Sequence, residues 1–480
     1  MTDRKNWLIY GATGYTGELI ARQAATQGDR PILAGRNAEK VAALATQLEC
    51  PNRSISLDEP AKIVGALADV DTVLNCAGPF AHTAPAWIAA CLAARVNYLD
   101  ITGEFEVIEL AAQHHEHARH AGVTLMPAVG FDVVPTDCLA AMLAERLPDA
   151  VRLELAFAME GRVSRGTAKT MLAAVPTGGR ARIAGRIEQV PSAWKSMRVP
   201  FADRPRWAMT IPWGDVSSAY YTTGIDNIEV YSAVPRATIA VLRLFRGPLK
   251  LLGWPPLARL VSRGIDRLAP GPDAAALARD RGQLWGRVTN RSGKQVTATL
   301  ETPGGYALTV LTALAAVERV RGGGTAAGFL TPARAFGPQF ICEFPSTSFR
   351  WAEDQPGVGG ESMTAEEVAS LVRRWFDQAR QVIGPVLPDG WFGRPHDNAF
   401  TLKDVRVVGD TVSVILSEET ALNVTRPRRV YLENSELVFD NFEHATFQWT
   451  DYDGTTHREK KFDSGQVRFA PPLGTTVTLA

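Results

Sequence analysis

The feature that most constrains this chain is a glycine-rich turn between an apolar strand and a helix. The segment WLIYGATGYTGELIARQA covers residues 7–24 and contains Gly11, Gly14 and Gly17. Glycines there allow a tight turn, a close approach of the backbone to a diphosphate, and close packing of helix on strand. The free N–H groups at the helix start attract phosphate. The turn therefore predicts a dinucleotide site, although its G-x-x-G-x-x-G spacing differs from the commoner G-x-G-x-x-G.

The turn opens a regular alternation of strand and helix patterns, which predicts a parallel sheet with right-handed crossovers. The predicted strands cover residues 7–12, 31–36, 53–58, 71–77, 97–102 and 123–129. Helical spacing of apolar residues covers 17–28, 37–49, 59–70, 83–96 and 106–122. We therefore expect the α/β class, with residues 1–144 forming a Rossmann domain with a doubly wound parallel sheet.

The pattern changes after Pro148. Residues 151–160 alternate apolar and polar side chains, as a half-buried antiparallel strand does. We expect an α+β substrate domain over residues 145–350, whose last segment returns to the Rossmann domain. A helix with a Thr364/Glu367 capping box and a β-rich stretch then predict a small C-terminal module over residues 362–480. Gly409-Asp410 is a predicted hairpin turn.

The end of the second predicted strand indicates which dinucleotide binds. An enzyme that uses NAD places an acidic residue there for the ribose 2′-hydroxyl. This chain has Gly35 and Arg36 instead. A guanidinium can make charge-assisted hydrogen bonds to a 2′-phosphate, so the sequence favours NADP over NAD. The alternative for Arg36 is a solvated side chain at a helix start.

Further cofactor-binding residues are expected from the turns at the carboxyl ends of the strands, where ligands of such sheets bind. Asp58 has an alternative role as a helix N-cap. The predicted cofactor-binding residues are Gly11, Thr13, Gly14, Tyr15, Thr16, Gly17, Arg36, Asn37, Asp58, Ala77, Gly78 and Pro79.

Two residues are the candidates for catalysis. The Tyr-x-x-x-Lys pair of short-chain dehydrogenases is absent from this sequence. Asp132 follows the sixth predicted strand, at the same rim as the glycine turn, where a partly desolvated carboxyl can act as an acid or base. A structural role for Asp132 is equally open. Tyr221 lies in a segment rich in aromatic and hydroxyl side chains, residues 211–231, which suits a pocket wall or a core strand.

Composition narrows the partners and the compartment. Lys plus Arg and Asp plus Glu number 51 each, so no net charge draws the chain to nucleic acid. Five cysteines without C-x-x-C spacing and no signal sequence predict a cytoplasmic protein. Histidines between His114 and His120 lack metal-ligand spacing, and we expect no metal. Residues 237–270 combine apolar and basic side chains, which fits a helical cover over a pocket or a contact with a membrane surface.

Several motifs in order resemble the saccharopine dehydrogenase-like oxidoreductases, in the branch of trans-acting enoyl reductases of lipid and polyketide assembly. They are GATGYTGELIA, ILAGRN, VLNCAGPF, NYLDITGE, MPAVGFDVVPTDC and PWGDVSSAYYTTGIDNIEVY, and the resemblance ends near residue 340. It implies a Rossmann domain with Gly11, Gly14, Gly17 and Arg36 on the cofactor. It also implies NADPH-dependent reduction of an enoyl acyl group, on a small molecule or a carrier. The resemblance supplies no fixed catalytic residue.

Two other functions stay open. One is oxidoreduction at a C–N bond of an amino-acid adduct, for which Arg162, Arg165, Arg180 and Arg182 would bind carboxylates. The other is a non-catalytic NADP-binding scaffold at a membrane. A homodimer is also open, and Trp391, Phe392 and His396 form an aromatic loop in the C-terminal module that suits an interaction site or a core plug.

Overall fold

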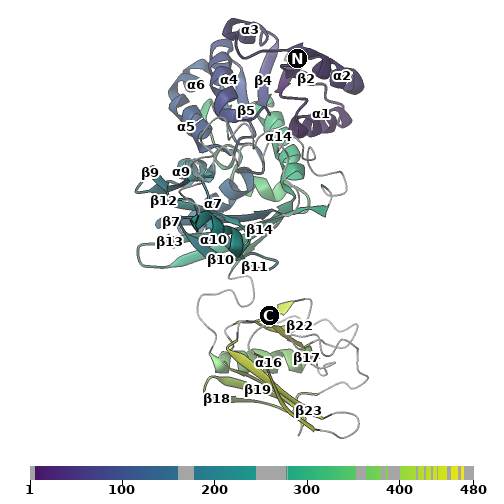
Figure 1. Ribbon diagram of the computed structural model, residues 1–480, viewed down its shortest axis with the longest axis vertical. Coiled ribbons are helices and arrows are strands. Elements are labelled where there is room, and N and C mark those ends of the chain that lie inside the picture. Colours follow the sequence, from purple (N-terminus) through teal and green to yellow (C-terminus); the bar gives the residue numbers. More distant parts are fainter. Residues whose placement is uncertain are drawn as a thin grey trace. The chain divides into compact units, whose positions relative to one another are not determined.

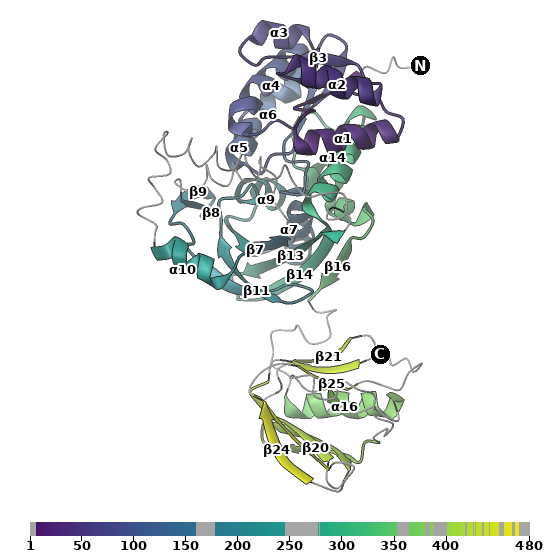
Figure 2. The same ribbon diagram turned by 45° about the vertical axis from the view of Figure 1, so that its right-hand side comes forward.

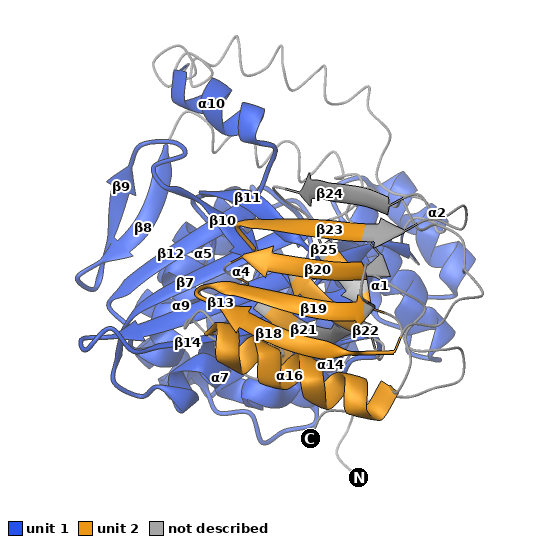
Figure 3. Cartoon of the chain, turned by 90° about the horizontal axis from the view of Figure 1, so that it is seen from below, with its two compact units in different colours: residues 1–349 blue, residues 350–480 orange. Residues whose placement is uncertain are grey.

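The computed structural model divides the chain into two compact units, residues 1–349 and 350–480 (Figure 3). The structure describes residues 6–159, 178–244, 277, 279–352, 364–379, 385–386, 401–417, 420–425, 427, 429–433, 436–440, 442–450, 456–462 and 466–469. Each unit is described by itself below.

The first unit begins with a parallel sheet that forms the Rossmann part (Figures 1 and 2). Its strand order is β15-β6-β5-β4-β1-β2-β3, and the order reverses between β1 and β4. The strands are β1 (Asn6–Tyr10), β2 (Ile32–Gly35), β3 (Asn52–Ser54), β4 (Val70–Asn75), β5 (Asn97–Asp100), β6 (Thr124–Met126) and β15 (Gly328–Phe329). Ligands of such sheets bind outside the carboxyl ends of the strands near this reversal, which is where the glycine turn lies.

Helices cover both faces of this sheet, because its central strands are apolar on both sides. One face packs against α1 (Tyr15–Thr26), α2 (Ala38–Leu48) and α14 (Gly305–Arg321). The other packs against α3 (Pro60–Gly65), α4 (Phe80–Ala94), α5 (Phe105–Gln113) and α6 (His115–Ala121). The predicted Rossmann fold is confirmed, with one difference: the helix expected over 106–122 breaks at His114 into α5 and α6.

The second part of this unit is a mixed sheet of order β10-β11-β12-β7-β13-β14-β16. In this sheet β7 and β12 run parallel, whereas β10–β11, β11–β12, β7–β13 and β13–β14 are antiparallel pairs. The hairpin β8–β9 joins through β12. The strands are β7 (Ala150–Met159), β8 (Gly179–Ile183), β9 (Arg186–Val190), β10 (Ser196–Pro200), β11 (Pro205–Thr210), β12 (Asn227–Ala233), β13 (Arg281–Asn290), β14 (Gln295–Pro303) and β16 (Ser348–Trp351). Its helices are α7 (Val134–Arg146), α9 (Asp215–Thr223), α10 (Arg236–Leu244), α15 (Pro332–Phe336) and the 3₁₀ helix η3 (Pro338–Glu343).

The chain returns from the mixed sheet to the Rossmann sheet through α14, which packs against α1 (Figure 2). It then adds β15 beside β6. This return was expected from the sequence. The segment around Tyr221 differs from one expectation, because it forms the helix α9 and not a core strand.

The second unit packs α16 (Ala365–Ala379) against antiparallel strands around its own core. The predicted capping box is confirmed: the Thr364 N–H donates to Glu367 Oε2 at 2.7 Å, and the Glu367 N–H donates to Thr364 Oγ1 at 3.3 Å. The strands are β17 (Pro385–Val386), β18 (Asp404–Val408), β19 (Thr411–Ser417), β20 (Thr420–Thr425), β21 (Arg429–Glu433), β22 (Glu436–Asp440), β23 (His444–Thr450), β24 (Thr456–Phe462) and β25 (Gln466–Phe469). Gly409-Asp410 connects β18 to β19, as predicted.

Candidate active site

The glycine turn has no room for side chains at its first and third glycines. Gly11 has a φ of +79°, and a Cβ there would lie 2.9 Å from the backbone N of Ala77. A Cβ on Gly17 would lie 2.3 Å from the carbonyl oxygen of Gly11. The turn therefore packs against its own helix and against the loop after β4. Because its glycines carry no side chains, a diphosphate could approach the backbone closely.

Helix α1 starts at this turn without a side-chain cap. Its N-cap residue is Gly14, so no side chain accepts from the free N–H groups of the first turn. These groups and the positive end of the helix dipole are available to phosphate oxygens. Tyr15, the first residue of the helix, packs edge-on against Tyr306 of α14, with ring centroids 4.9 Å apart.

Strand β2 ends at Gly35, and the predicted phosphate-binding residue Arg36 follows it directly. Gly35 is buried, Arg36 is exposed, and Asn37 accepts from the Lys40 N–H at 2.9 Å as the N-cap of α2. Asp58 is also exposed and accepts from the Ser56 hydroxyl. The alternative role of Asp58 is wrong, because the N-cap of α3 is Glu59 and makes no side-chain capping bond.

The loop after β4 is held by a carboxylate from the loop after β5. Glu104 accepts from the N–H groups of Phe80 and Ala81, at 2.8 and 2.7 Å. The bonds fix the start of α4 directly after the cis Gly78–Pro79 peptide. Ala77, Gly78 and Pro79 thus lie between the glycine turn and the β5 loop, although Glu104 itself is occupied in a structural contact.

Asp132 lies at the same rim, in the loop between β6 and α7. Its side chain is partly buried, and a Cβ on Gly103 would lie 2.9 Å from its Oδ2. Burial, together with the charge of Glu104, raises the pKa of the Asp132 carboxyl to about 7. Among the described residues no hydrogen bond holds this carboxyl group, so it is free to exchange a proton with a ligand at neutral pH.

An aromatic group flanks Asp132 on the side of the mixed sheet. The Trp213 indole N–H donates to the carbonyl oxygen of Asp132 at 2.7 Å, and the Trp213 ring lies 5.1 Å from that of Phe157. Phe131 contacts Phe157 edge-on at 6.5 Å. Of these three rings only Trp213 belongs to residues 211–231, for which the sequence suggested a pocket wall.

A sequence profile of the family described as saccharopine dehydrogenase NADP binding domain matches residues 7–126. These residues form an NADP-binding domain of that family. The match agrees with the glycine cradle and with Arg36 in place of an acidic residue, and it confirms NADP as the predicted cofactor.

Curated relatives match a part of this chain of about the same length. A protein named trans-acting enoyl reductase from Mycobacterium tuberculosis is 30% identical over 138 residues, which are 27% of this chain and 33% of that protein. An Arabidopsis thaliana protein named as a probable mitochondrial saccharopine dehydrogenase-like oxidoreductase is 30% identical over 147 residues, 27% of this chain and 32% of its own. The chain thus spans about a third of the length of the curated relatives it matches.

The solved structure of saccharopine dehydrogenase (L-Glu forming) from Saccharomyces cerevisiae has the same overall fold. It matches with a TM-score of 0.53 at 13% identity and covers 72% of this chain and 99% of its own. The likeness therefore extends from the NADP-binding domain into the mixed sheet.

Tyr221 lies away from the rim of the NADP-binding domain. Its hydroxyl donates to Glu109 Oε2 at 2.9 Å, and its ring packs against Phe329 of β15. Burial and the Glu109 carboxylate raise its pKa well above the usual tyrosine value. Because its proton is already donated to a carboxylate of α5, Asp132 is the better placed of the two candidates.

Other acidic residues near the rim have structural contacts. Asp100 accepts from the N–H groups of Thr102 and Ala128 and from the Tyr98 hydroxyl. Asp137 accepts from the Thr222 hydroxyl and the Ala333 N–H. Asp215 differs from these two: it is fully buried at the start of α9, and its carboxyl oxygens have no hydrogen-bond partner among the described residues.

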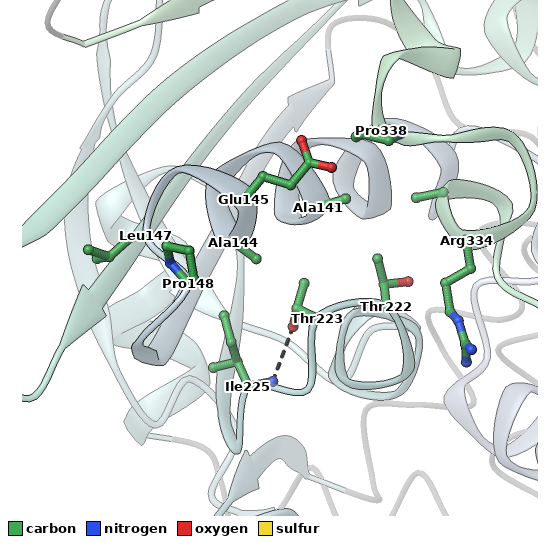
Figure 4. Close-up of a pocket in the computed structure, with 11 residues that line it drawn as sticks. Ala141, Ala144, Glu145, Leu147, Pro148, Thr222, Thr223, Ile225, Arg334 and Pro338 are labelled. Atoms are coloured by element: carbon green, nitrogen blue, oxygen red, sulfur yellow. Dashed lines mark hydrogen bonds between the residues drawn. The ribbon is translucent and has the colours of Figure 1, made fainter.

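A cavity of about 370 Å³ lies at the opposite ends of α7 and α9 from Asp132 (Figure 4). Glu145, Thr222, Thr223 and Arg334 line it together with small apolar residues. It lies away from the glycine turn, so it is not the cofactor site.

Several sequence expectations lie outside the described residues: Arg162, Arg165, Trp391, Phe392, His396 and positions 245–270 of the amphipathic stretch. Within the described ranges, no group of three or more His, Cys, Asp and Glu side chains could hold a metal ion. No helix in those ranges is long and apolar enough to cross a membrane.

Proposed function

We propose that this chain is an NADPH-dependent oxidoreductase that reduces the carbon–carbon double bond of an enoyl thioester, with Asp132 as the proton donor. The NADP-binding domain and the enoyl reductase names of its relatives support this proposal. The single observation that carries it is the Asp132 carboxyl, partly buried at the strand-end rim with its pKa raised to about 7.

The described residues fit the cofactor. The backbone at Gly11 and Gly17 forms a cradle that any Cβ would fill, and the start of α1 has no competing side-chain cap. Arg36 supplies a positive charge for the 2′-phosphate. Bound NADPH would supply a hydride, which the β-carbon of the substrate accepts.

Asp132 completes the reduction by giving its proton to the α-carbon, and its carboxylate is left behind. A pKa near 7 suits this role, because a general acid works best when its pKa lies close to the operating pH. The apolar rings of Phe131, Phe157 and Trp213 limit water on one side of Asp132, which maintains the raised pKa.

The alternative reaction, oxidoreduction at a C–N bond of an amino-acid adduct, depended on a group of arginines that would bind the carboxylates of the substrate. Arg182, one of the two that are described, is 5% exposed and already donates to Val216 O, Gly185 O and Glu109. Its guanidinium is therefore occupied in packing β8 against α9 and α5 and is not available to a substrate carboxylate.

The test follows NADPH absorbance after adding acceptors of three classes: 2-enoyl coenzyme A thioesters of several lengths, imines formed from an amino acid and an aldehyde, and simple ketones. We expect oxidation with the thioesters alone, and deuterium from labelled NADPH at the β-carbon of the product. Oxidation with imines alone would replace the proposal by the C–N reaction. Tight NADPH binding without oxidation by any acceptor would favour a scaffold.

A further inference from the structure

Two helix starts converge at the cofactor turn, and only one belongs to the NADP-binding domain. Helix α1 starts at Tyr15, and α14 starts at Gly305, about 290 residues later in the chain. The helices pack against each other (Figures 1 and 2), and the Tyr15 and Tyr306 rings meet edge-on at 4.9 Å. The return segment therefore reaches the diphosphate turn.

Both helix starts are built in the same uncapped way. Each has a glycine as its N-cap, Gly14 and Gly304, and neither makes a side-chain capping bond. Helix α14 also lacks an acidic residue in its first turn. Two positive helix ends that lie close together repel each other unless an anion lies between them. The same turn is the diphosphate cradle of a domain that binds NADP.

The start of α14 is fixed by close packing. A Cβ on Gly304 would lie 2.6 Å from the Cβ of Asp280, and a Cβ on Gly305 would lie 3.2 Å from the Met159 sulfur. The two glycines thus let the helix begin close to the ends of β7 and β13. This packing sets where Tyr306 lies relative to the turn.

One turn further along, α14 is bonded to the loop that carries Asp132. The Phe131 N–H donates to Thr309 Oγ1 at 3.0 Å, and the Thr312 hydroxyl donates to Val129 O at 2.7 Å. A Cβ on Gly130 would lie 3.1 Å from the Thr309 methyl group. Val129 and Phe131 are thus hydrogen-bonded to this helix, and Gly130 between them packs closely against it.

We propose that Tyr306 is a cofactor-binding residue contributed by the return segment, and that α14 transmits cofactor occupancy to the Asp132 loop. The Tyr306 ring packs edge-on against Tyr15, the residue with which the helix after the glycine turn begins. Binding of NADPH then fixes the start of α14, and Thr309 and Thr312 fix residues 129–131. The inference depends on the NADP-binding domain and not on which substrate is reduced.

The first test is a calorimetric titration of NADPH into the full chain and its variants Tyr306→Ala and Tyr306→Phe. We expect Tyr306→Ala to weaken binding about tenfold, since it removes both ring and hydroxyl, and Tyr306→Phe to weaken it about threefold. Glu318→Gln, at an exposed position on the same helix, is the matched control and should bind as wild type does. Binding by Tyr306→Ala within twofold of wild type would overturn the assignment.

The second test measures amide hydrogen exchange in residues 127–133 with and without NADPH. In the wild-type protein, NADPH should slow exchange at the Phe131 amide, which donates to Thr309. In Tyr306→Ala at saturating NADPH this protection should be lost, while protection of residues 11–17 remains. Equal protection of residues 127–133 in both proteins would refute the link through α14. Thr309→Val, which removes the acceptor for the Phe131 N–H, should abolish the protection with little change in NADPH affinity.

Both readouts are independent of the acyl substrate. If Tyr306→Ala weakens NADPH binding but no thioester is reduced, the cofactor assignment stands and the enoyl reductase proposal fails. If thioesters are reduced and Tyr306→Ala binds NADPH as the wild type does, the enoyl reductase proposal stands and the assignment of Tyr306 fails.

Discussion

The loops at the carboxyl ends of the parallel strands form one rim of the Rossmann sheet, and the two halves of this rim are built in different ways. The half at β1 and β2 comes from residues close together in the chain, the glycine turn and Arg36, and its important groups are backbone or exposed side chains. The half at β5 and β6 comes from three distant segments that meet around Asp132: Gly103, Trp213 and Phe157. The binding predicted for the first half depends on local geometry, and the chemistry proposed for the second depends on burial.

Because the two halves are built differently, we expect substitutions in them to change different quantities. In the first half a substitution should alter cofactor affinity while the chemistry of Asp132 is unchanged. In the second half a substitution should alter the rate or its pH dependence while cofactor affinity is largely kept.

The largest effect is expected for Asp132→Asn, which keeps the shape of the side chain but removes the proton. We expect the rate of NADPH oxidation with a thioester acceptor to fall by about 10²- to 10⁴-fold, the usual contribution of a general acid. Stopped-flow absorbance measures it. Asp226→Asn, an exposed loop residue of the same unit, is the control and should keep the wild-type rate. A loss below threefold for Asp132→Asn would remove Asp132 from the chemistry.

Gly17→Ala should have the next largest effect, and on affinity. The added Cβ would lie 2.3 Å from the Gly11 carbonyl oxygen, so the turn or α1 must move. Such overpacking costs about 1–3 kcal/mol, and we expect the Kd for NADPH to rise about 10- to 100-fold. Gly65→Ala, where a Cβ meets nothing within 4 Å, is the matched control. Equal affinities for the two variants would show that the turn does not hold the cofactor.

Arg36→Ala should change the preference of the first half of the rim for NADPH over NADH. Loss of a charged hydrogen bond to the 2′-phosphate should raise the Kd for NADPH about tenfold and leave that for NADH unchanged. Fluorescence titration with both dinucleotides measures the ratio. An equal loss of affinity for NADPH and NADH would mean that Arg36 stabilises the fold and does not bind the 2′-phosphate.

The last prediction concerns stability and the buried carboxyl groups of the second half. Burial raises the pKa of Asp100 and Asp137 to about 6 and that of Asp132 to about 7, whereas an Asp in an unfolded chain titrates near 3.9. Between these values the folded state binds more protons than the unfolded chain. The free energy of unfolding should therefore fall as the pH rises from about 4 to 7, by at most roughly 1.4 kcal/mol per pH unit for each group.

Asp132→Asn should make this fall smaller, most clearly between pH 6 and 7. Thermal unfolding at a series of pH values measures it, and Asp58→Asn, an exposed carboxyl of the same unit, is the control. An unchanged pH dependence in Asp132→Asn would mean that Asp132 titrates normally.

The same contrast explains what could be predicted from sequence. The glycine turn and the parallel sheet depend on short-range patterns, so they were predicted correctly. The partners of Asp132 and Tyr221 depend on contacts between segments more than 80 residues apart, which no local pattern encodes. Tyr221 was therefore chosen for its chemistry, and the structure pairs it with Glu109. Tyr306 was missed because its only sequence signal is a Gly-Gly-Tyr before a helix.

The central claim, that the turn and Arg36 hold NADP, is tested most directly by calorimetric titration of the wild-type chain with NADPH and then with NADH. The account predicts that NADPH binds with a Kd at least about tenfold lower than NADH, because the 2′-phosphate adds a charge-assisted contact. Tighter binding of NADH, or no measurable heat with either dinucleotide, would contradict it.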